Sequence, residues 1–92
     1  MIISFGNSST EKIWKGEGVK EFRSFEDKAM NKLRLINGAS SLDDLKSPPG
    51  NRLEKLKGKR KNQYSVRIND QYRICFIWTE QGVHSVEIVD YH

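Results

Sequence analysis

The chain of 92 residues is 36% hydrophobic and 10% aromatic, which predicts one domain over residues 1–92. A chain of this size buries only about 60–65% of its unfolded surface, around a single core. The formal charge of +4 and an isoelectric point near 9.3 favour polyanionic partners. No run approaches the ~18 continuous apolar residues of a membrane span, and the first residues lack the basic-then-apolar order of a signal peptide. These patterns exclude a membrane partner and predict a cytoplasmic protein.

The first residues predict a strand and a brief helix. Residues 2–5 have the apolar character of a short opening strand, and residues 8–15 could form a short helix. Gly16 and Gly18 interrupt any continuation of that helix, because glycine loses the most conformational freedom when it is ordered. A mobile loop is therefore expected after residue 15.

The clearest helical signal follows Ser24. Ser24 is a candidate N-cap, with Asp27 three positions later, and Gly38 lies where a left-handed residue often ends a helix. Apolar side chains recur between them at helical spacing, namely Phe25, Ala29, Leu33 and Ile36. The pattern predicts a helix over residues 25–37 with one apolar face.

A second helix start at Ser40 or Ser41 leads into a short helix over residues 42–46, which the Pro48-Pro49-Gly50 stretch ends. The character then changes to strands. Turn residues at Asn69-Asp70 and Gln81-Gly82 separate runs of apolar alternation. The expected strands are a weak one over residues 51–57, then 63–68, 72–78 and 83–92.

This order of elements predicts an α+β fold. Consecutive hairpin-linked strands form a mostly antiparallel, twisted sheet. The helices that precede them in the chain pack on one face of that sheet.

Positive charge is concentrated in the strand-rich half of the chain. Between residues 52 and 73 there are eight basic residues against two acidic ones. A lone KGKRK run can be a solvated hairpin tip, but aromatic residues interleave with this one, as in surfaces that neutralise phosphates and stack on bases. The basic residues that we expect to bind RNA phosphates are Lys57, Lys59, Arg60, Lys61, Arg67 and Arg73.

Arg73 occurs within YRICFIW, an apolar strand pattern, and a buried guanidinium requires a partner. Two interpretations remain open. Arg73 either pairs with a carboxylate, such as Glu87 or Asp90, or it stands at a groove and binds a phosphate.

The chain ends in EIVDYH, a strand pattern that runs into three reactive side chains. On a strand, Asp90 and His92 would face one side about 6.5–7 Å apart, and Tyr91 the other. Asp90 or His92 could act as general base or general acid in cleaving RNA through its 2′-OH, while Arg73 and Lys57 hold the phosphate. An exposed, charged tail is the alternative.

No metal or cofactor is expected. His84, Asp90 and His92 show no familiar ligand spacing, and Cys75 is a lone thiol inside an apolar run. Cys75 is therefore expected to be a small buried hydrophobe.

Three stretches together, SPPGNRLEKLKG, YSVRINDQYRICFIW and the terminal VEIVDYH, resemble the HigB branch of the RelE/ParE toxin superfamily over nearly the whole chain. The resemblance implies a RelE-like toxin that enters the ribosomal A site and cuts messenger RNA. It also implies a partner, a HigA-like antitoxin with a helix-turn-helix domain, through which the complex binds operator DNA.

The resemblance also implies roles for individual residues. Asp90, Tyr91 and His92 match the catalytic ending of the family, with Tyr91 orienting or stacking against a base, while Arg73 and Lys57 match its phosphate-contacting positions. Glu54 stands where some HigB toxins have a catalytic histidine, and a carboxylate can also act as a general base. Two other functions remain open: poisoning of DNA gyrase, as in the ParE branch, and binding of RNA or antitoxin without cleavage.

Overall fold

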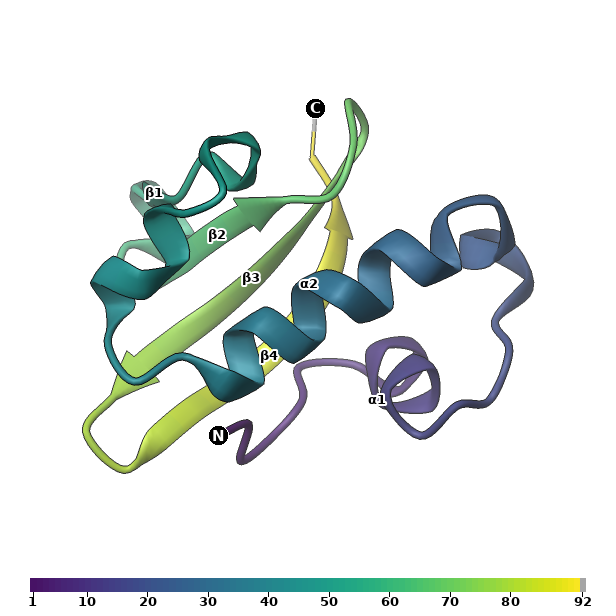
Figure 1. Cartoon of the computed structure of the whole chain (residues 1–92), viewed down its shortest axis with the longest axis horizontal. Helices are drawn as coiled ribbons and strands as arrows, with labels where there is room; N and C mark the ends of the chain where they lie inside the picture. Colours follow the sequence, from purple (N-terminus) through teal and green to yellow (C-terminus); the bar gives the residue numbers. More distant parts are fainter. Residues whose placement is uncertain (92) are drawn as a thin grey trace.

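Four antiparallel strands in the order β1-β2-β3-β4 form the sheet, and the helices that precede them cover one of its faces (Figure 1). The structure is a computed structural model that describes residues 1–91, so His92 lies outside the described residues. The α+β fold is confirmed. Its helices and strands are α1 (Ser8–Trp14), α2 (Glu26–Gly38), β1 (Glu54–Lys55), β2 (Tyr64–Arg67), β3 (Tyr72–Thr79) and β4 (Gly82–Asp90). Four 3₁₀ helices join them, namely Lys20–Phe25, Leu42–Lys46, Pro49–Asn51 and Gly58–Arg60.

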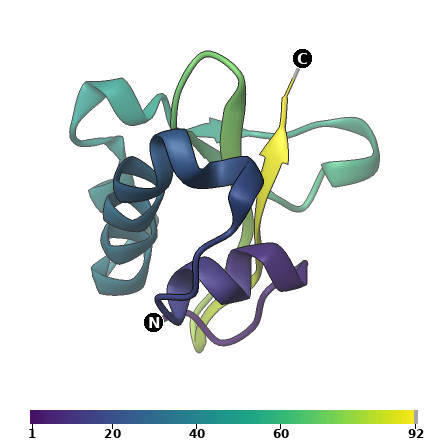
Figure 2. The same cartoon turned by 90° about the vertical axis from the view of Figure 1, so that its right-hand side faces the viewer.

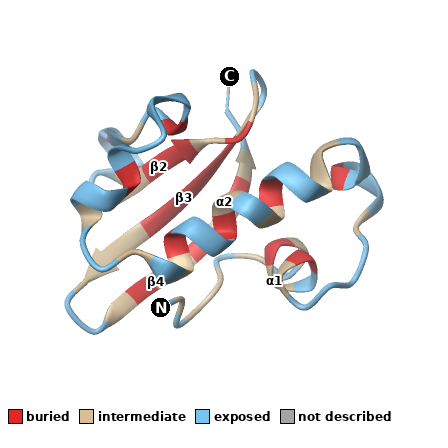
Figure 3. Cartoon of the chain, viewed as in Figure 1, coloured by how far each residue is buried: buried red, intermediate tan, exposed pale blue. Residues whose placement is uncertain are grey.

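The main core lies between α2 and the sheet (Figures 1 and 3). Ala29, Leu33 and Ile36, all fully buried, form the apolar stripe of α2 at the predicted helical spacing. They share one core cluster with Ile74 and Phe76 of β3. Burying such a side chain stabilises the fold by about 1.5–3 kcal/mol, so this stripe holds α2 on the sheet.

The outer edge of β4 is covered by the N-terminal residues. Residues 2–5 do not form the continuous strand that was predicted. They make isolated parallel bridges to β4 at Ile2 and Phe5. Gly82 allows this approach, because a Cβ there would lie 2.5 Å from the side chain of Ile3. With its edge covered in this way, β4 offers few unpaired backbone groups to another chain.

The predicted boundaries of α2 were partly wrong. Ser24 lies inside the 3₁₀ helix Lys20–Phe25, and α2 begins at Glu26 without a side-chain cap. The reason is tertiary: Phe22 is buried, and its ring lies 5.7 Å from that of Tyr72, centroid to centroid. Burying that ring orders the segment after the glycines, where a loop was expected.

Other local predictions agree with the structure. The Ser41 side chain and that of Asp44 form a reciprocal capping box at the start of the 3₁₀ helix Leu42–Lys46. Cys75 is buried, as expected. Within residues 1–91 there is no helix long and apolar enough to cross a membrane.

Leu33→Ala is predicted to lower the free energy of unfolding by about 2–5 kcal/mol, because it removes buried methyl groups and leaves a cavity between α2 and the sheet. Urea denaturation followed by circular dichroism measures the change. Leu35→Ala, on the same helix but at a residue that is 42% exposed, is the matched control. A loss that is equal in the two variants would contradict this description of the core.

Candidate functional site

The sheet face that points away from α2, called the open face here, carries the candidate site. The strand register places four residues in one row across the sheet, one from each strand: Glu54, Ser65, Cys75 and Glu87. Side chains directly opposite one another on paired strands share a face. A second row on the same face runs from Arg67 through Arg73 to Val89.

Arg73 is the buried centre of this face, with only 7% of its surface exposed. Its Nε donates to the Ser65 hydroxyl at 2.7 Å, and its Nη2 donates to the Arg52 carbonyl at 2.6 Å. Arg52 is in the left-handed region, with φ at 44°, just before β1. Nη2 also donates to the Ser65 carbonyl at 3.4 Å, so three neutral oxygens hold the guanidinium.

The proposed pairing of Arg73 with Glu87 or Asp90 is wrong for the described residues. No ion pair between Arg73 and a carboxylate occurs within residues 1–91. Glu87 instead pairs with Arg60, and the Asp90 carboxylate accepts a hydrogen bond from the Gln71 side chain at 3.0 Å. The reason is the sheet register, because Asp90 lies opposite Tyr72, one position away from the row of Arg73.

The Tyr91 ring lies beside the guanidinium of Arg73. The Cζ atom of Arg73 is 5.7 Å from the centre of the Tyr91 ring, within the range of a cation–π contact. The Tyr91 backbone N–H donates to the Gln71 carbonyl at 2.7 Å, and 43% of the residue is exposed. Tyr91 thus joins Arg73 on the open face, while Asp90 has the opposite strand parity.

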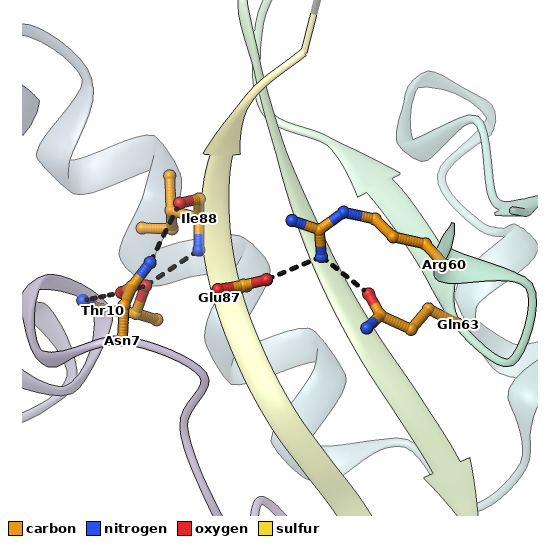
Figure 4. A network of polar contacts seen from close by, with 6 residues as sticks. All are labelled: Asn7, Thr10, Arg60, Gln63, Glu87 and Ile88. Atoms are coloured by element: carbon orange, nitrogen blue, oxygen red, sulfur yellow. Dashed lines mark hydrogen bonds and ion pairs between the residues drawn. The ribbon is translucent and has the colours of Figure 1, made fainter. Parts of the chain in front are cut away.

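The basic residues 57–61, called the basic loop here, also lie on the open face, on the opposite side of β4 from α2 (Figure 2). Lys57, Lys59 and Lys61 are exposed. Arg60 is half-buried and donates from Nη1 to Glu87 at 2.6 Å and to Gln63 at 3.0 Å (Figure 4). The hydrogen bond to Glu87 raises the pKa of Arg60, so Arg60 stays charged and shares its charge with a carboxylate.

Arg67 is likewise paired, with the fully exposed carboxylate of Asp70. It also acts electrostatically on Lys32 of α2, which neighbours Lys28, and sequence reasoning missed both lysines. Burial, Lys28 and Arg67 together lower the pKa of Lys32, and the Lys32 ammonium donates to Asn51. The i, i+4 spacing of Lys28 and Lys32 was a signal that could have joined them to the basic surface.

Glu54 lies at the far edge of the site. It is exposed on β1 and stands opposite Ser65, the residue that holds Arg73. Three strand spacings and three residue steps separate Glu54 from Asp90, which amounts to about 14 Å across the sheet and about 10 Å along it. The structure therefore places the predicted acid–base residues Glu54 and Asp90 apart.

The arrangement can bind a polyanion without a resident ion. A buried guanidinium, an exposed aromatic ring and a loop of lysines together offer phosphate contacts and a stacking surface. Among residues 1–91 no group of three side chains is placed to ligate a metal ion.

The family described as the RelE-like toxin of the type II toxin-antitoxin system HigB matches residues 5–92, a range that includes every candidate residue above. The chain belongs to this HigB-like toxin family. It is 41% identical over 69 residues to Toxin HigB-1 of Vibrio cholerae serotype O1, covering 75% of this chain and 72% of that protein. An uncharacterized protein of Haemophilus influenzae is 38% identical over 55 residues, or 60% of this chain and 54% of the other.

Solved structures of YoeB from Staphylococcus aureus resemble this HigB-like toxin in fold. The heterotetrameric YoeB–YefM toxin-antitoxin complex matches with a TM-score of 0.63 at 21% identity, over 100% of this chain and 95% of that one. The YoeB dimer matches with a TM-score of 0.57 at 21% identity, over 99% and 94%. Family and fold agree: the chain is a RelE-like toxin of a type II toxin-antitoxin system.

Ser65→Ala is predicted to lower the free energy of unfolding of this HigB-like toxin by about 1–3 kcal/mol, because Arg73 Nε would lose its buried acceptor. Guanidinium denaturation measures the difference. Ser24→Ala, at an exposed serine without a capping role, is the matched control. Equal stability of the two variants would show that the hydroxyl does not hold Arg73.

Proposed function

We propose that this toxin is a ribosome-dependent endoribonuclease that cuts messenger RNA and thereby inhibits translation. The observation that carries the proposal is the environment of Arg73. Within residues 1–91 its hydrogen bonds use Nε and Nη2, and no buried side-chain nitrogen or oxygen lacks a partner. Nη1 is not used by these hydrogen bonds, and the guanidinium lies beside the exposed Tyr91 ring. A donor held rigidly at such a place suits a phosphate oxygen.

The proposed chemistry proceeds through the 2′-OH of the RNA. A general base removes the 2′-OH proton, and the oxygen attacks the adjacent phosphorus. Arg73 and Lys57 stabilise the negative charge of the phosphorane, and a general acid protonates the departing 5′-oxygen. Protons are conserved in this step, and it requires neither a cofactor nor a metal.

The acid–base pair is proposed to come from the end of β4, as Asp90 and His92. Asp90 has the opposite strand parity to Arg73, but it pairs with Tyr72, the first residue of β3, so it lies at the end of the sheet. Glu54 is separated from Asp90 by about 14 Å across the sheet, so the two are too far apart to act on the same phosphate. We assign to Glu54 a contact with a neighbouring nucleotide of the bound strand. Lys59, Lys61 and Arg67 are proposed to contact further phosphates along that strand.

Tyr91 is proposed to stack on a base next to the cleaved bond. Its ring is already held by Arg73 on one side, and 43% of the residue is open to solvent. Stacking on an aromatic ring tolerates any base, since every base has a π-face.

The antitoxin is proposed to be a HigA-like protein with a helix-turn-helix domain, so that the complex binds operator DNA through the antitoxin. The YoeB relatives were solved as toxin-antitoxin complexes, which supports direct binding between the two proteins. The toxin is proposed to act in the cytoplasm, where it meets the ribosomal A site.

Asp90→Asn is predicted to slow messenger RNA cleavage by about 10²–10⁴-fold, because one acid–base role is lost. Primer extension on transcripts from a translating extract maps and quantifies the cuts. Asp43→Asn, at a carboxylate whose side chain is 77% exposed, is the control that keeps its activity. Intact transcripts together with slowed DNA supercoiling by the wild-type toxin would contradict the proposal and favour the gyrase alternative.

Tyr91→Ala is predicted to slow the same cleavage by about 5- to 150-fold, which corresponds to one stacked base worth about 1–3 kcal/mol. Binding of the antitoxin, measured by pull-down, should be retained because the sheet is unchanged. Cleavage at the wild-type rate would show that Tyr91 does not contact the RNA.

A further inference from the structure

An ion pair ties the basic loop to the last strand. Arg60 and Glu87 are 27 residues apart in the chain, and their side chains meet over the open face of the sheet (Figure 4). The same Nη1 atom also donates to Gln63, at the base of the loop. Cys75 lies fully buried on the same face, in the row of Glu87.

The side chain of Glu87 packs directly against Gly6. A Cβ at Gly6 would lie 2.9 Å from Glu87 Oε2 and 3.0 Å from both Cβ and Cδ of Glu87. A real side chain at this position would force Glu87 to move. Gly6 belongs to the segment that covers the edge of β4, so the N-terminal residues and the carboxylate fit each other closely.

The pair also differs from the surface pairs of this chain. The side chains of Arg60 and Glu87 are 36% and 19% exposed, against 71% and 77% for Lys46 and Asp43. An exposed pair contributes little to stability, because water screens it and two long side chains lose freedom. A half-buried, charge-assisted hydrogen bond is considerably stronger.

We propose that Glu87 is a positioning residue that, through Arg60, holds the basic loop over the open face and so presets its lysines for RNA. This inference rests on the proposed function. The lysines of the basic loop have long side chains, and the backbone of the loop is short and irregular. Ordering the side chains and the backbone when RNA binds costs conformational entropy. A loop that is already held loses less of this entropy, which is the general benefit of preorganisation.

A direct role for Arg60 gives the opposite expectation. If Arg60 were itself a phosphate ligand, removing the charge of Glu87 would release a cation and strengthen RNA binding. In the positioning role the same change weakens binding, because the loop is no longer held. The sign of the effect therefore separates the two roles.

The first measurement is limited trypsin digestion of the full-length toxin, with the cuts after Lys57, Lys59 and Lys61 followed by mass spectrometry. Glu87→Gln and Gly6→Ala should both speed these cuts by about tenfold, since the open loop becomes more populated. Gly6→Ala leaves every charge in place. Asp43→Asn, which breaks the exposed ion pair, is the matched control and should not change the rate.

The second measurement is affinity for a fluorescent single-stranded RNA of mixed sequence. Glu87→Gln and Gly6→Ala should each weaken RNA binding by about three- to tenfold. The double variant Arg60→Gln/Glu87→Gln should bind RNA no more weakly than Glu87→Gln or Gly6→Ala alone. In ribosome-dependent cleavage KM should rise while kcat stays near the wild-type value. If Glu87 had a purely structural role, KM would not rise without a change in kcat. Circular dichroism confirms that each variant is folded.

Tighter RNA binding by Glu87→Gln would overturn the proposal in favour of direct phosphate binding by Arg60. Unchanged digestion in both Glu87→Gln and Gly6→Ala would overturn it as well. If the variants show faster digestion and weaker RNA binding but the wild-type toxin cuts no message, the positioning role stands and the proposed endonuclease fails. If cleavage occurs and digestion is unchanged, only the positioning role fails.

Discussion

The buried guanidinium of Arg73 is the constraint on which the site depends. A charge inside a sheet is costly unless its donors are satisfied, and here Ser65 and the Arg52 carbonyl supply the acceptors. The second acceptor requires the chain before β1 to turn through a left-handed residue, which a non-glycine residue adopts only with strain. The position of β1, and of the basic loop that follows it, is thus linked to a single side chain of the central strand.

The last strand is held from two directions, and this places Tyr91, which follows it. On its outer edge, the Thr10 hydroxyl accepts the Ile88 N–H at 2.8 Å, and Asn7 donates to the Ile88 carbonyl at 3.4 Å (Figure 4). On the open face, Arg60 donates a hydrogen bond to Glu87, the residue before Ile88. Terminal residues usually fray, but Tyr91 here follows a strand that is fixed up to its last positions.

These two constraints meet at the proposed reaction site. Arg73 on β3 is held by Ser65 and Arg52, and Tyr91 directly follows β4. Their contact therefore depends on the correct register of β3 and β4. The surrounding charges are mostly compensated: Arg60 pairs with Glu87 and Arg67 with Asp70. The exposed lysines of the basic loop therefore provide most of the uncompensated charge on this face, and their order is what the ion pair controls.

Local patterns predicted a large part of the fold. The apolar stripe of α2, the helix start at Ser41 and the antiparallel strands follow from spacing and turn chemistry, which depend on near neighbours in the chain. Ser24 failed as a cap because the burial of Phe22, a contact with a distant strand, was stronger than a local capping preference. The opening strand was shortened to isolated bridges for a similar reason, since the edge of β4 determines where residues 2–5 can pair.

The sequence by itself determined the α+β class, the family and the identity of the candidate site residues, because these follow from periodicity, from motifs and from the types of side chain present. Only the tertiary structure decided which groups meet. In the structure Arg73 donates to a hydroxyl and a carbonyl and not to a carboxylate, and Glu87 pairs with Arg60. Glu54 and Asp90 lie apart on the sheet. The physical reason is register: a shift of one position along a strand exchanges its two faces, and local sequence does not specify the cross-strand pairing.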